Sequence, residues 1–169
     1  MNPLVSIILG SDSDLSVMKG ATDVLDEFGV ANEILVISAH RNPEGLTSHI
    51  KNSKAQVFIG AAGGSAHLPG VIAAQTTKPV IGVPIKTKNM EGLDSLLSIA
   101  QMPSGVPVAT VAVDGARNAG ILAIQILAIS NEDLQEELLE FKKKLKSSVE
   151  KKSKKLQEVG VKKYLDEMK

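Results

Sequence analysis

A hydroxyl, an imidazole and a guanidinium stand together in the four residues Ser38-Ala39-His40-Arg41. An imidazole transfers protons near neutral pH, and a guanidinium pairs with phosphate or carboxylate groups. Arginine is otherwise rare here, since Arg117 is the only other one in 169 residues. The four residues predict a site that binds an anion and moves a proton, although an ordinary polar loop with a surface arginine would look the same at this level.

The flanking residues predict where this loop sits in the fold. The apolar run 34–37 precedes it and is typical of a buried strand. Asn42-Pro43-Glu44 follows it and is a helix-start signal, with an N-cap residue, proline at the first helical position and an acidic first turn. Loops between a strand and a helix are where open α/β sheets bind their ligands.

Two further polar segments follow strand-like runs in the same way. Residues 10–14 (Gly-Ser-Asp-Ser-Asp) come after the apolar run 4–9, and the glycine-rich stretch 60–70 comes after 57–59. Glycine lets backbone N–H groups approach an anion closely, and Pro69 indicates a helix start within this stretch. Because parallel strands point the same way, we expect all three loops at one edge of the sheet.

Several local alternatives remain open for these residues. Asp14 is suited to accept hydrogen bonds from sugar hydroxyls or to cap the following helix, and capping is the better supported role on local signal alone. His49 falls within an expected helix with no polar partner in view, which indicates a structural role. Asp12, Asp14, His40 and His67 lack tight ligand spacing, so we expect no metal site.

Known cofactor and nucleophile motifs do not occur in the sequence. The stretch 60–70 matches neither the dinucleotide fingerprint nor the P-loop, and there is no Gly-x-Ser-x-Gly elbow. The residues therefore predict chemistry without a cofactor, on a small anionic molecule with sugar hydroxyls, using a histidine as the proton carrier.

The elements that position these loops alternate along residues 1–130. We expect strands at 4–9, 34–37, 57–59, 79–85 and 107–113, and helices ending near 28 and covering 43–51, 71–75, 93–100 and 116–129. Gly29 suits the end of the first helix. Five strand–helix alternations predict a single α/β catalytic domain, a doubly wound parallel sheet with helices on both faces.

Residues 131–169 differ in composition and are expected to form a C-terminal helical extension. They contain 11 of the 19 basic residues, all of them lysine, and 9 of the 19 acidic residues. Leu134, Leu138, Phe141 and Leu145 share one helical face, so this segment should pack on the domain or on a neighbouring subunit. The lysine runs are more typical of a solvated face than of an anion site, because the net charge of the segment is only +2.

The composition of the whole chain excludes several classes of function. Basic and acidic residues number 19 each and aromatic residues make up 2%, which argues against a nucleic-acid partner. The chain has no cysteine, so disulfides and thiolate metal sites are excluded. Neither a signal peptide nor an apolar run of membrane-spanning length is present, and we expect a cytoplasmic protein without a membrane partner.

Several motifs together resemble the PurE family of purine biosynthesis, in unbroken order to about residue 130. They are Gly10-Ser11-x-Ser13-Asp14, Ser38-Ala39-His40-Arg41, Gly63-Gly64-Ser65-Ala66-His67-Leu68-Pro69-Gly70, Gly82-Val83-Pro84, Asp94-Ser95-Leu96, Gln101-Met102-Pro103-x-Gly105-Val106-Pro107-Val108 and Asn118-Ala119. Arg41 and the run His67 to Gly70 resemble class I of the family, the N5-carboxyaminoimidazole ribonucleotide mutases, rather than class II, which carboxylates aminoimidazole ribonucleotide with CO2.

The resemblance implies a flavodoxin-like three-layer sandwich that assembles as a homo-octamer with active sites at subunit junctions. It implies a carboxylate shift from N5 to C4 of an imidazole ribonucleotide, without ATP, metal or organic cofactor, and His40 as the general acid/base. Ser11, Ser38 and Arg41 match contacts to the phosphate, and Asp14 matches a contact to the ribose. The residues that match the loop around the base and its carboxylate are Gly63, Gly64, Ser65, His67 and Leu68.

The sequence departs from the family pattern at four places, one of which is the lysine-rich tail beyond about residue 150, whose role stays open. Gly60-Ala61 stands where the family more often has Ala-Gly, and Ser65 replaces the usual alanine. The segment 114–117 is about two residues shorter than usual. Two rival functions remain, direct CO2-dependent carboxylation on the same scaffold and a nucleotide-binding module that does no chemistry.

Overall fold

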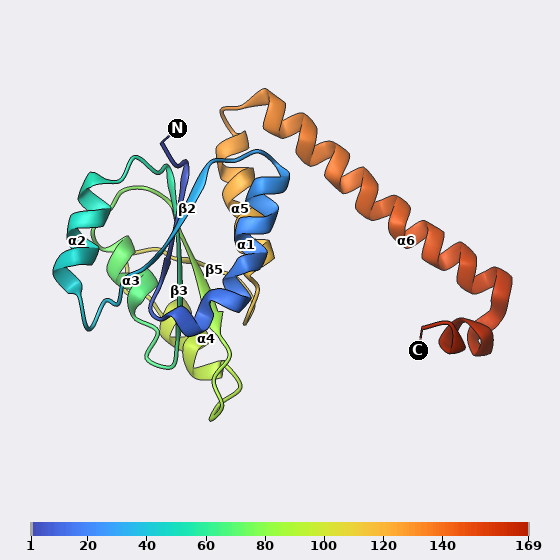
Figure 1. Ribbon diagram of the computed structural model, residues 1–169, viewed down its shortest axis with the longest axis horizontal. Coiled ribbons are helices and arrows are strands. Elements are labelled where there is room, and N and C mark those ends of the chain that lie inside the picture. Colours follow the sequence, from blue (N-terminus) through green and yellow to red (C-terminus); the bar gives the residue numbers. More distant parts are fainter. Residues whose placement is uncertain (1, 169) are drawn as a thin grey trace.

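The computed structural model describes residues 2–168 and contains one parallel five-stranded sheet (Figure 1). The strands lie in the order β2-β1-β3-β4-β5. Their bounds are β1 Val5–Leu9, β2 Asn32–Val36, β3 Val57–Gly63, β4 Val80–Ile85 and β5 Ala109–Thr110. This order is that of a flavodoxin-like doubly wound fold, as expected from the sequence.

Helices cover both faces of the sheet and make a three-layer sandwich (Figure 1). The helices are α1 Leu15–Glu27, α2 Pro43–Asn52, α3 Leu68–Ala73, α4 Leu93–Ala100, α5 Ala116–Ala128 and α6 Glu132–Asp166, and a short 3-10 turn, Asp12–Asp14, precedes α1. α1 and α5 pack on one face of the sheet, and α2, α3 and α4 pack on the other face.

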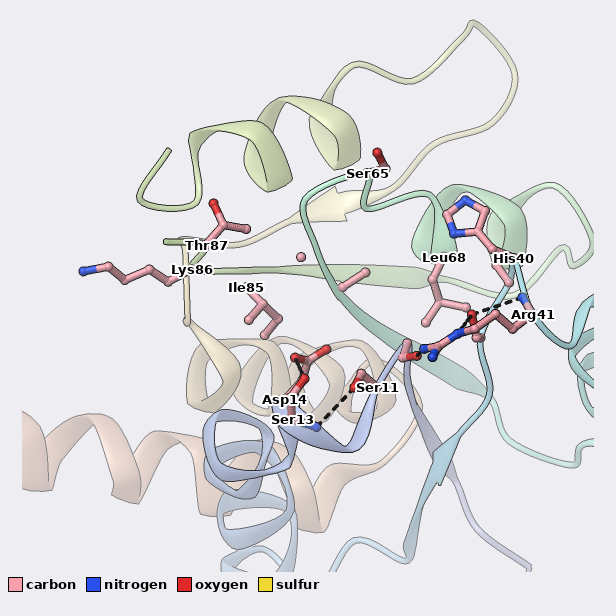
Figure 2. A pocket seen from close by; sticks show the side chains of 15 residues that line it. Ser11, Ser13, Asp14, His40, Arg41, Ser65, Leu68, Ile85, Lys86 and Thr87 are labelled. Atoms are coloured by element: carbon pink, nitrogen blue, oxygen red, sulfur yellow. Dashed lines mark hydrogen bonds between the residues drawn. The ribbon is translucent and has the colours of Figure 1, made fainter. Parts of the chain in front are cut away.

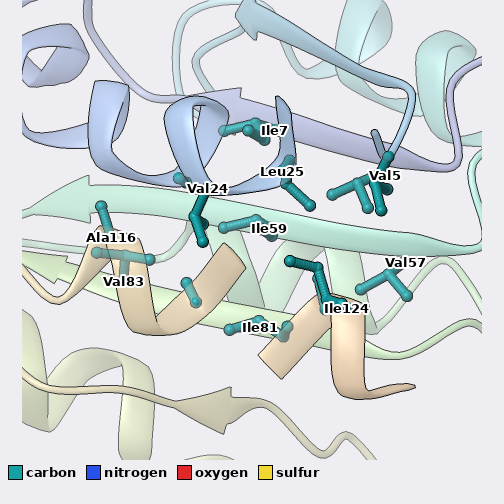
Figure 3. Close-up of a cluster of buried hydrophobic side chains, with 14 of the residues drawn as sticks. Val5, Ile7, Val24, Leu25, Val57, Ile59, Ile81, Val83, Ala116 and Ile124 are labelled. Atoms are coloured by element: carbon teal, nitrogen blue, oxygen red, sulfur yellow. The ribbon is translucent and has the colours of Figure 1, made fainter. Parts of the chain in front are cut away.

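Alternation along the strands divides the buried side chains into two clusters. Ile7 and Ile59 face α1 and α5, whereas their neighbours Ile8 and Phe58 face the other helix layer. Figure 3 shows the first cluster, in which Val24, Leu25 and Ile124 of the helices meet the strands. Strands buried on both faces are continuous apolar runs, which is why they were recognisable in the sequence.

Two strands differ in length from the sequence prediction. β3 extends to Gly63, so the first four residues of the expected loop 60–70 belong to the sheet. β3 lies between β1 and β4 and pairs with both, Ala61 with Leu9 and Gly63 with Ile85. Ladder pairing on both sides outweighs the low strand preference of glycine. Gly60 also brings α3 close to the sheet, since a Cβ there would lie 3.1 Å from the Pro69 Cα.

β5 has two residues instead of the expected seven, 107–113. The N–H of Val111 donates to the Gly82 carbonyl at 3.1 Å, and the N–H of Asp114 donates to the Pro84 carbonyl at 2.8 Å. Residues 82 and 84 therefore direct their backbone groups toward β5, but Pro84 has no N–H to donate. The ladder between β4 and β5 ends at Pro84 because this residue offers a carbonyl acceptor but no N–H donor.

The starts of two other elements differ from the sequence prediction by two or three residues. β2 covers Asn32–Val36 rather than 34–37, and α3 begins at Leu68 rather than at residue 71. The expected caps are confirmed: Asn42 Oδ1 accepts the N–H of Gly45 at 3.0 Å, and Gly29 follows α1 with a φ of 62°. Positive φ is a conformation that favours glycine.

The long helix α6 packs on the domain only at its start and then projects away from it (Figure 1). Leu134 is buried, Leu138 packs on the core, and the Phe141 ring lies edge-on to Phe28 with centroids 5.6 Å apart. Leu145, expected on the same packed face, is exposed. The helix bends at Gly160, where φ is 77°. No helix within residues 2–168 is long and apolar enough to span a membrane.

Candidate active site

A cavity of about 350 Å3 lies at the carboxyl edge of the sheet, where β1, β2, β3 and β4 end (Figure 2). Eight of the ten site residues expected from the sequence line it: Ser11, Asp14, Ser38, His40, Arg41, Gly63, Ser65 and Leu68. Gly64 and His67 lie outside the lining. The three loops therefore meet at one edge, as parallel strands require.

Arg41 joins the first two loops. Its Nη2 donates to the Gly10 carbonyl at 3.0 Å, and its Nε donates to Ser38 Oγ at 3.3 Å. The guanidinium forms no ion pair with any carboxylate of residues 2–168. The positive charge is thus held in place by neutral acceptors and remains available to an anion.

His40 and His67 contact each other although 27 residues separate them. A hydrogen bond of 2.9 Å joins His40 Nε2 to His67 Nδ1, and the rings stand edge-on with centroids 5.0 Å apart. One of these two nitrogens must carry the proton, so the tautomers of the two rings depend on each other. Both side chains are exposed in the single chain. His67 therefore does not line the cavity itself and is connected to it by its hydrogen bond to His40.

Asp14 is the most buried carboxylate at the cavity, with 8% of its surface exposed. Burial raises the pKa of this carboxyl above its ordinary value, the charges of Asp12 and Asp114 act in the same direction, and a hydrogen bond from the Ser13 hydroxyl (2.9 Å) opposes them. Asp14 occupies the N-cap position of α1 but its side chain makes no capping bond. The capping role favoured by local sequence signal is therefore wrong.

A further group of lining residues, at the end of β4, was not predicted from the sequence. Ile85, Lys86 and Thr87 line the cavity, together with Gly10, Ser13, Ala39 and Ala62. The Lys86 side chain extends away from His40 (Figure 2) and its ammonium pairs with Glu91, while the Thr87 hydroxyl donates to Asp94 at 2.9 Å. Parallel strands all end at the same edge of the sheet, which is how the first three loops were predicted to meet. The same reasoning applies to the end of β4 and predicts these residues at the cavity.

His49 has polar partners, although none could be identified in the sequence. Its Nε2 lies 2.9 Å from the Ser6 hydroxyl and 3.6 Å from the Glu33 carboxylate. The partners belong to β1 and β2, which α2 covers, so they become neighbours only after the sheet forms. None of the three residues lines the cavity. The structural role expected for His49 thus has a polar basis within the fold.

Comparisons with known proteins place the chain in context. A family model described as AIR carboxylase matches residues 4–148. The chain is 56% identical over 168 residues to the N5-carboxyaminoimidazole ribonucleotide mutase of Pyrococcus horikoshii, covering 98% of this chain and 95% of that protein. It is 51% identical over 168 residues to the mutase of the same name from Thermotoga maritima, covering 98% of each.

A solved structure of the same architecture supports the fold. The crystal structure of Treponema denticola PurE superimposes with a TM-score of 0.84 at 26% identity, covering 92% of this chain and 99% of that chain. The resemblance to PurE stated from the motifs is confirmed by these relatives, which extend over nearly the whole chain.

The buried carboxylate at the cavity leads to a prediction about stability and pH. A raised pKa means that Asp14 destabilises the fold once it is ionised: its contribution is fully favourable below the unfolded pKa, roughly 3.9, and is lost as pH rises through the folded pKa. We expect Asp14→Asn to raise the melting temperature at pH 7, by an amount that shrinks toward zero near pH 3. Thermal unfolding measured from pH 3 to 8 tests this.

The exposed Asp12 provides the matched control for this measurement. Asp12→Asn makes the same chemical change at an exposed carboxyl, whose charge adds less to the raised pKa of Asp14 than burial does, and should therefore change the melting temperature much less than Asp14→Asn. A destabilised Asp14→Asn variant at pH 7, or a gain that persists unchanged at pH 3, would contradict the burial argument.

Proposed function

The chain belongs to the AIR carboxylase family, and we propose that it is an N5-carboxyaminoimidazole ribonucleotide mutase of purine biosynthesis. This enzyme moves a carboxylate from N5 to C4 of the imidazole ring. The observation that carries the proposal is the similarity at 56% and 51% identity, over nearly the full length of both chains, to proteins of that name. The cavity adds support, because it gathers the polar side chains that such a substrate needs.

The phosphate and ribose of the substrate bind where β1 and β2 end. Arg41, oriented by Gly10 and Ser38, supplies the charge that pairs with the phosphate, and the Ser11 and Ser38 hydroxyls complete its surroundings. Asp14 accepts hydrogen bonds from the ribose hydroxyls. Those bonds restore to the buried carboxylate some of the solvation that it lost on folding. The base then extends toward Ser65 and Leu68.

His40 carries the proton in both steps of the reaction. Protonated His40 gives its proton to N5, the N5–carboxylate bond breaks, and CO2 leaves without its bonding electron pair, which stays on nitrogen. C4 then attacks CO2 and forms the new C–C bond, and neutral His40 removes the proton from C4. The His40 side chain is thereby returned to its protonated form, so no oxidant, reductant or cofactor is required.

A neighbouring subunit closes the site. CO2 must stay trapped between the two steps, which requires a cavity without free access to water. In the single chain His40 and His67 are exposed, and apolar side chains of Leu15, Met90 and Leu93 are exposed on elements that border the cavity. An uncovered apolar surface beside an open site favours cover by a second copy, in line with the homo-octamer that the PurE resemblance implies.

The C-terminal extension, residues 131–169, contributes to this assembly while residues 1–130 form the catalytic domain. Residues 132–140 contain five acidic residues and no basic one, whereas residues 142–155 contain eight lysines and one glutamate. A groove between α1 and α6 has an apolar lining of Phe28, Phe141 and Leu145, and the charged side chains around it are five acidic ones and one lysine, Lys144. The basic half of α6 from a second, antiparallel copy complements the mainly acidic groove in charge.

Turnover of the two candidate substrates tests the proposed function. We expect rapid conversion of N5-carboxyaminoimidazole ribonucleotide without ATP or added metal, whereas aminoimidazole ribonucleotide should need very high CO2. Preference for the non-carboxylated nucleotide at modest bicarbonate would move the chain to direct carboxylation. Binding of the nucleotide with no turnover of either compound would indicate a module that does no chemistry.

Replacing the proton carrier separates chemistry from binding. We expect His40→Asn to reduce kcat by at least about a thousandfold, within the range that general acid/base catalysis contributes, because asparagine cannot exchange a proton at neutral pH. The Kd for the nucleotide, measured by calorimetry, should stay within about threefold. Equal loss of binding and turnover would refute the assignment. Arg41→Ala is the comparison variant, in which the loss should fall mainly on Kd.

Reversing the charge of the basic segment tests the role of α6. We expect the substitution of Lys151, Lys152, Lys154 and Lys155 by glutamate to lower the mass measured by sedimentation, because like charges would then face the acidic groove. Glutamate at Lys162 and Lys163, beyond the bend at Gly160, is the control. Unchanged mass in the first variant would exclude this pairing.

A further inference from the structure

Ser95, near the start of α4, has a side chain that is completely buried but polar. Its exposed fraction is 0%, and Ser6 and Asp14 are the other buried polar residues in the part of the chain that the structure describes. A buried hydroxyl is costly unless both its donor and its acceptor capacity are used. The hydrogen-bond partners of Ser95 therefore indicate the role of its hydroxyl.

The hydroxyl of Ser95 joins the ends of two neighbouring strands. It accepts the N–H of Gly64, just after β3, at 2.9 Å, and it donates to the carbonyl of Ile85, the last residue of β4, at 2.7 Å. The sheet ladder between β3 and β4 ends at the pair Gly63 and Ile85. Ser95 thus continues the connection between these strands one residue beyond the last backbone pair.

The other backbone group of Gly64 is bonded to the same helix. Ser98 Oγ lies 3.2 Å from the Gly64 carbonyl and 2.7 Å from the Asp94 carbonyl, and its single proton is shared between these two acceptors. Gly64 has a φ of 67°, a conformation that side chains other than glycine adopt at a cost. The turn at which the chain leaves the sheet is therefore held on both its donor and its acceptor side by α4.

This turn leads directly to the histidine pair. The N–H of Ala66 donates to the Gly64 carbonyl and the N–H of His67 donates to the Ser65 carbonyl, both at 2.8 Å. His67 lies three residues after Gly64 and bonds His40 Nε2 at 2.9 Å. Because the short segment from Gly64 to His67 is hydrogen-bonded internally, a displacement of Gly64 would also displace the His67 ring, which orients His40.

From this connection we infer that Ser95 is a positioning residue for the proton transfer by His40, an inference that rests on the proposed function. Ser95 fixes the turn at Gly64, the turn fixes His67, and His67 fixes the orientation and tautomer of His40. The hydroxyl touches neither Arg41 nor Asp14, which belong to the loops after β2 and β1. Its effect is therefore on the reacting end of the substrate and not on the phosphate end.

Removal of the hydroxyl should lower kcat far more than it raises KM. A displacement of about 1 Å in reacting groups is able to reduce rate a hundredfold. We expect Ser95→Ala to reduce kcat by about tenfold or more while KM for the N5-carboxylated nucleotide changes less than about threefold. Ser95→Cys, which keeps a weak donor and acceptor at similar size, should recover part of the lost kcat.

Ser6→Ala is the matched control for general destabilisation. Ser6 is also 0% exposed and hydrogen-bonded, to His49, but it lies away from the cavity. Both alanine variants should lower the melting temperature, and only Ser95→Ala should lose kcat. Equal kcat in the two variants, or an equal loss in both, would overturn the positioning role.

A spectroscopic readout keeps this test separate from the proposed function. In Ser95→Ala the Gly64 amide should exchange with solvent faster, and the ring resonances of His40 and His67 should shift, whereas Ser6→Ala should leave them in place. If the wild-type protein converts neither nucleotide, the proposed function fails while these signals still report on the connection. Unchanged exchange and ring resonances in Ser95→Ala would overturn the inference even in an active enzyme.

Discussion

Parallel pairing of the five strands sets the positions of the helices, the loops and the cavity. Every strand points the same way, so each polar segment that follows a strand leaves the sheet at the same edge. Residues far apart in the sequence, such as Asp14, His40 and Ser65, thereby line one cavity. The two helix layers bury both faces of the sheet and leave this edge as the place where polar side chains collect.

The helices also contribute to the geometry of the site through their packing. α4 places Ile99 in the core beside β4, and it places Ser95, one turn earlier, and Ser98, the preceding residue, on the turn at Gly64. α3 begins at Leu68 next to His67, and its close approach to β3 depends on the small residue at position 60. Burial of apolar surface therefore determines where the imidazole of His67 lies, without any apolar group entering the reaction.

The cavity also shows how binding and stability oppose each other. Asp14 is buried before any ligand is present, and burial of an ionised carboxylate costs stability. His40, His67 and several apolar side chains near the cavity are exposed. Both features are unfavourable for an isolated chain, and both are relieved when ribose hydroxyls and a second copy complete the site, as proposed above. Such local costs are common at functional sites.

The fold class, the ends of most helices and most of the residues at the cavity could be predicted from the amino-acid sequence alone. Apolar runs, a capping residue such as Asn42, a helix-ending glycine such as Gly29 and the common edge of parallel strands are local or topological signals, and they need no coordinates. The lengths of β3 and β5, the partners of His49 and the bond between His40 and His67 could not be predicted and are seen only in the folded chain. These depend on which backbone groups and side chains meet across the sheet. Such meetings join residues 27 or 43 positions apart, and no local pattern encodes them.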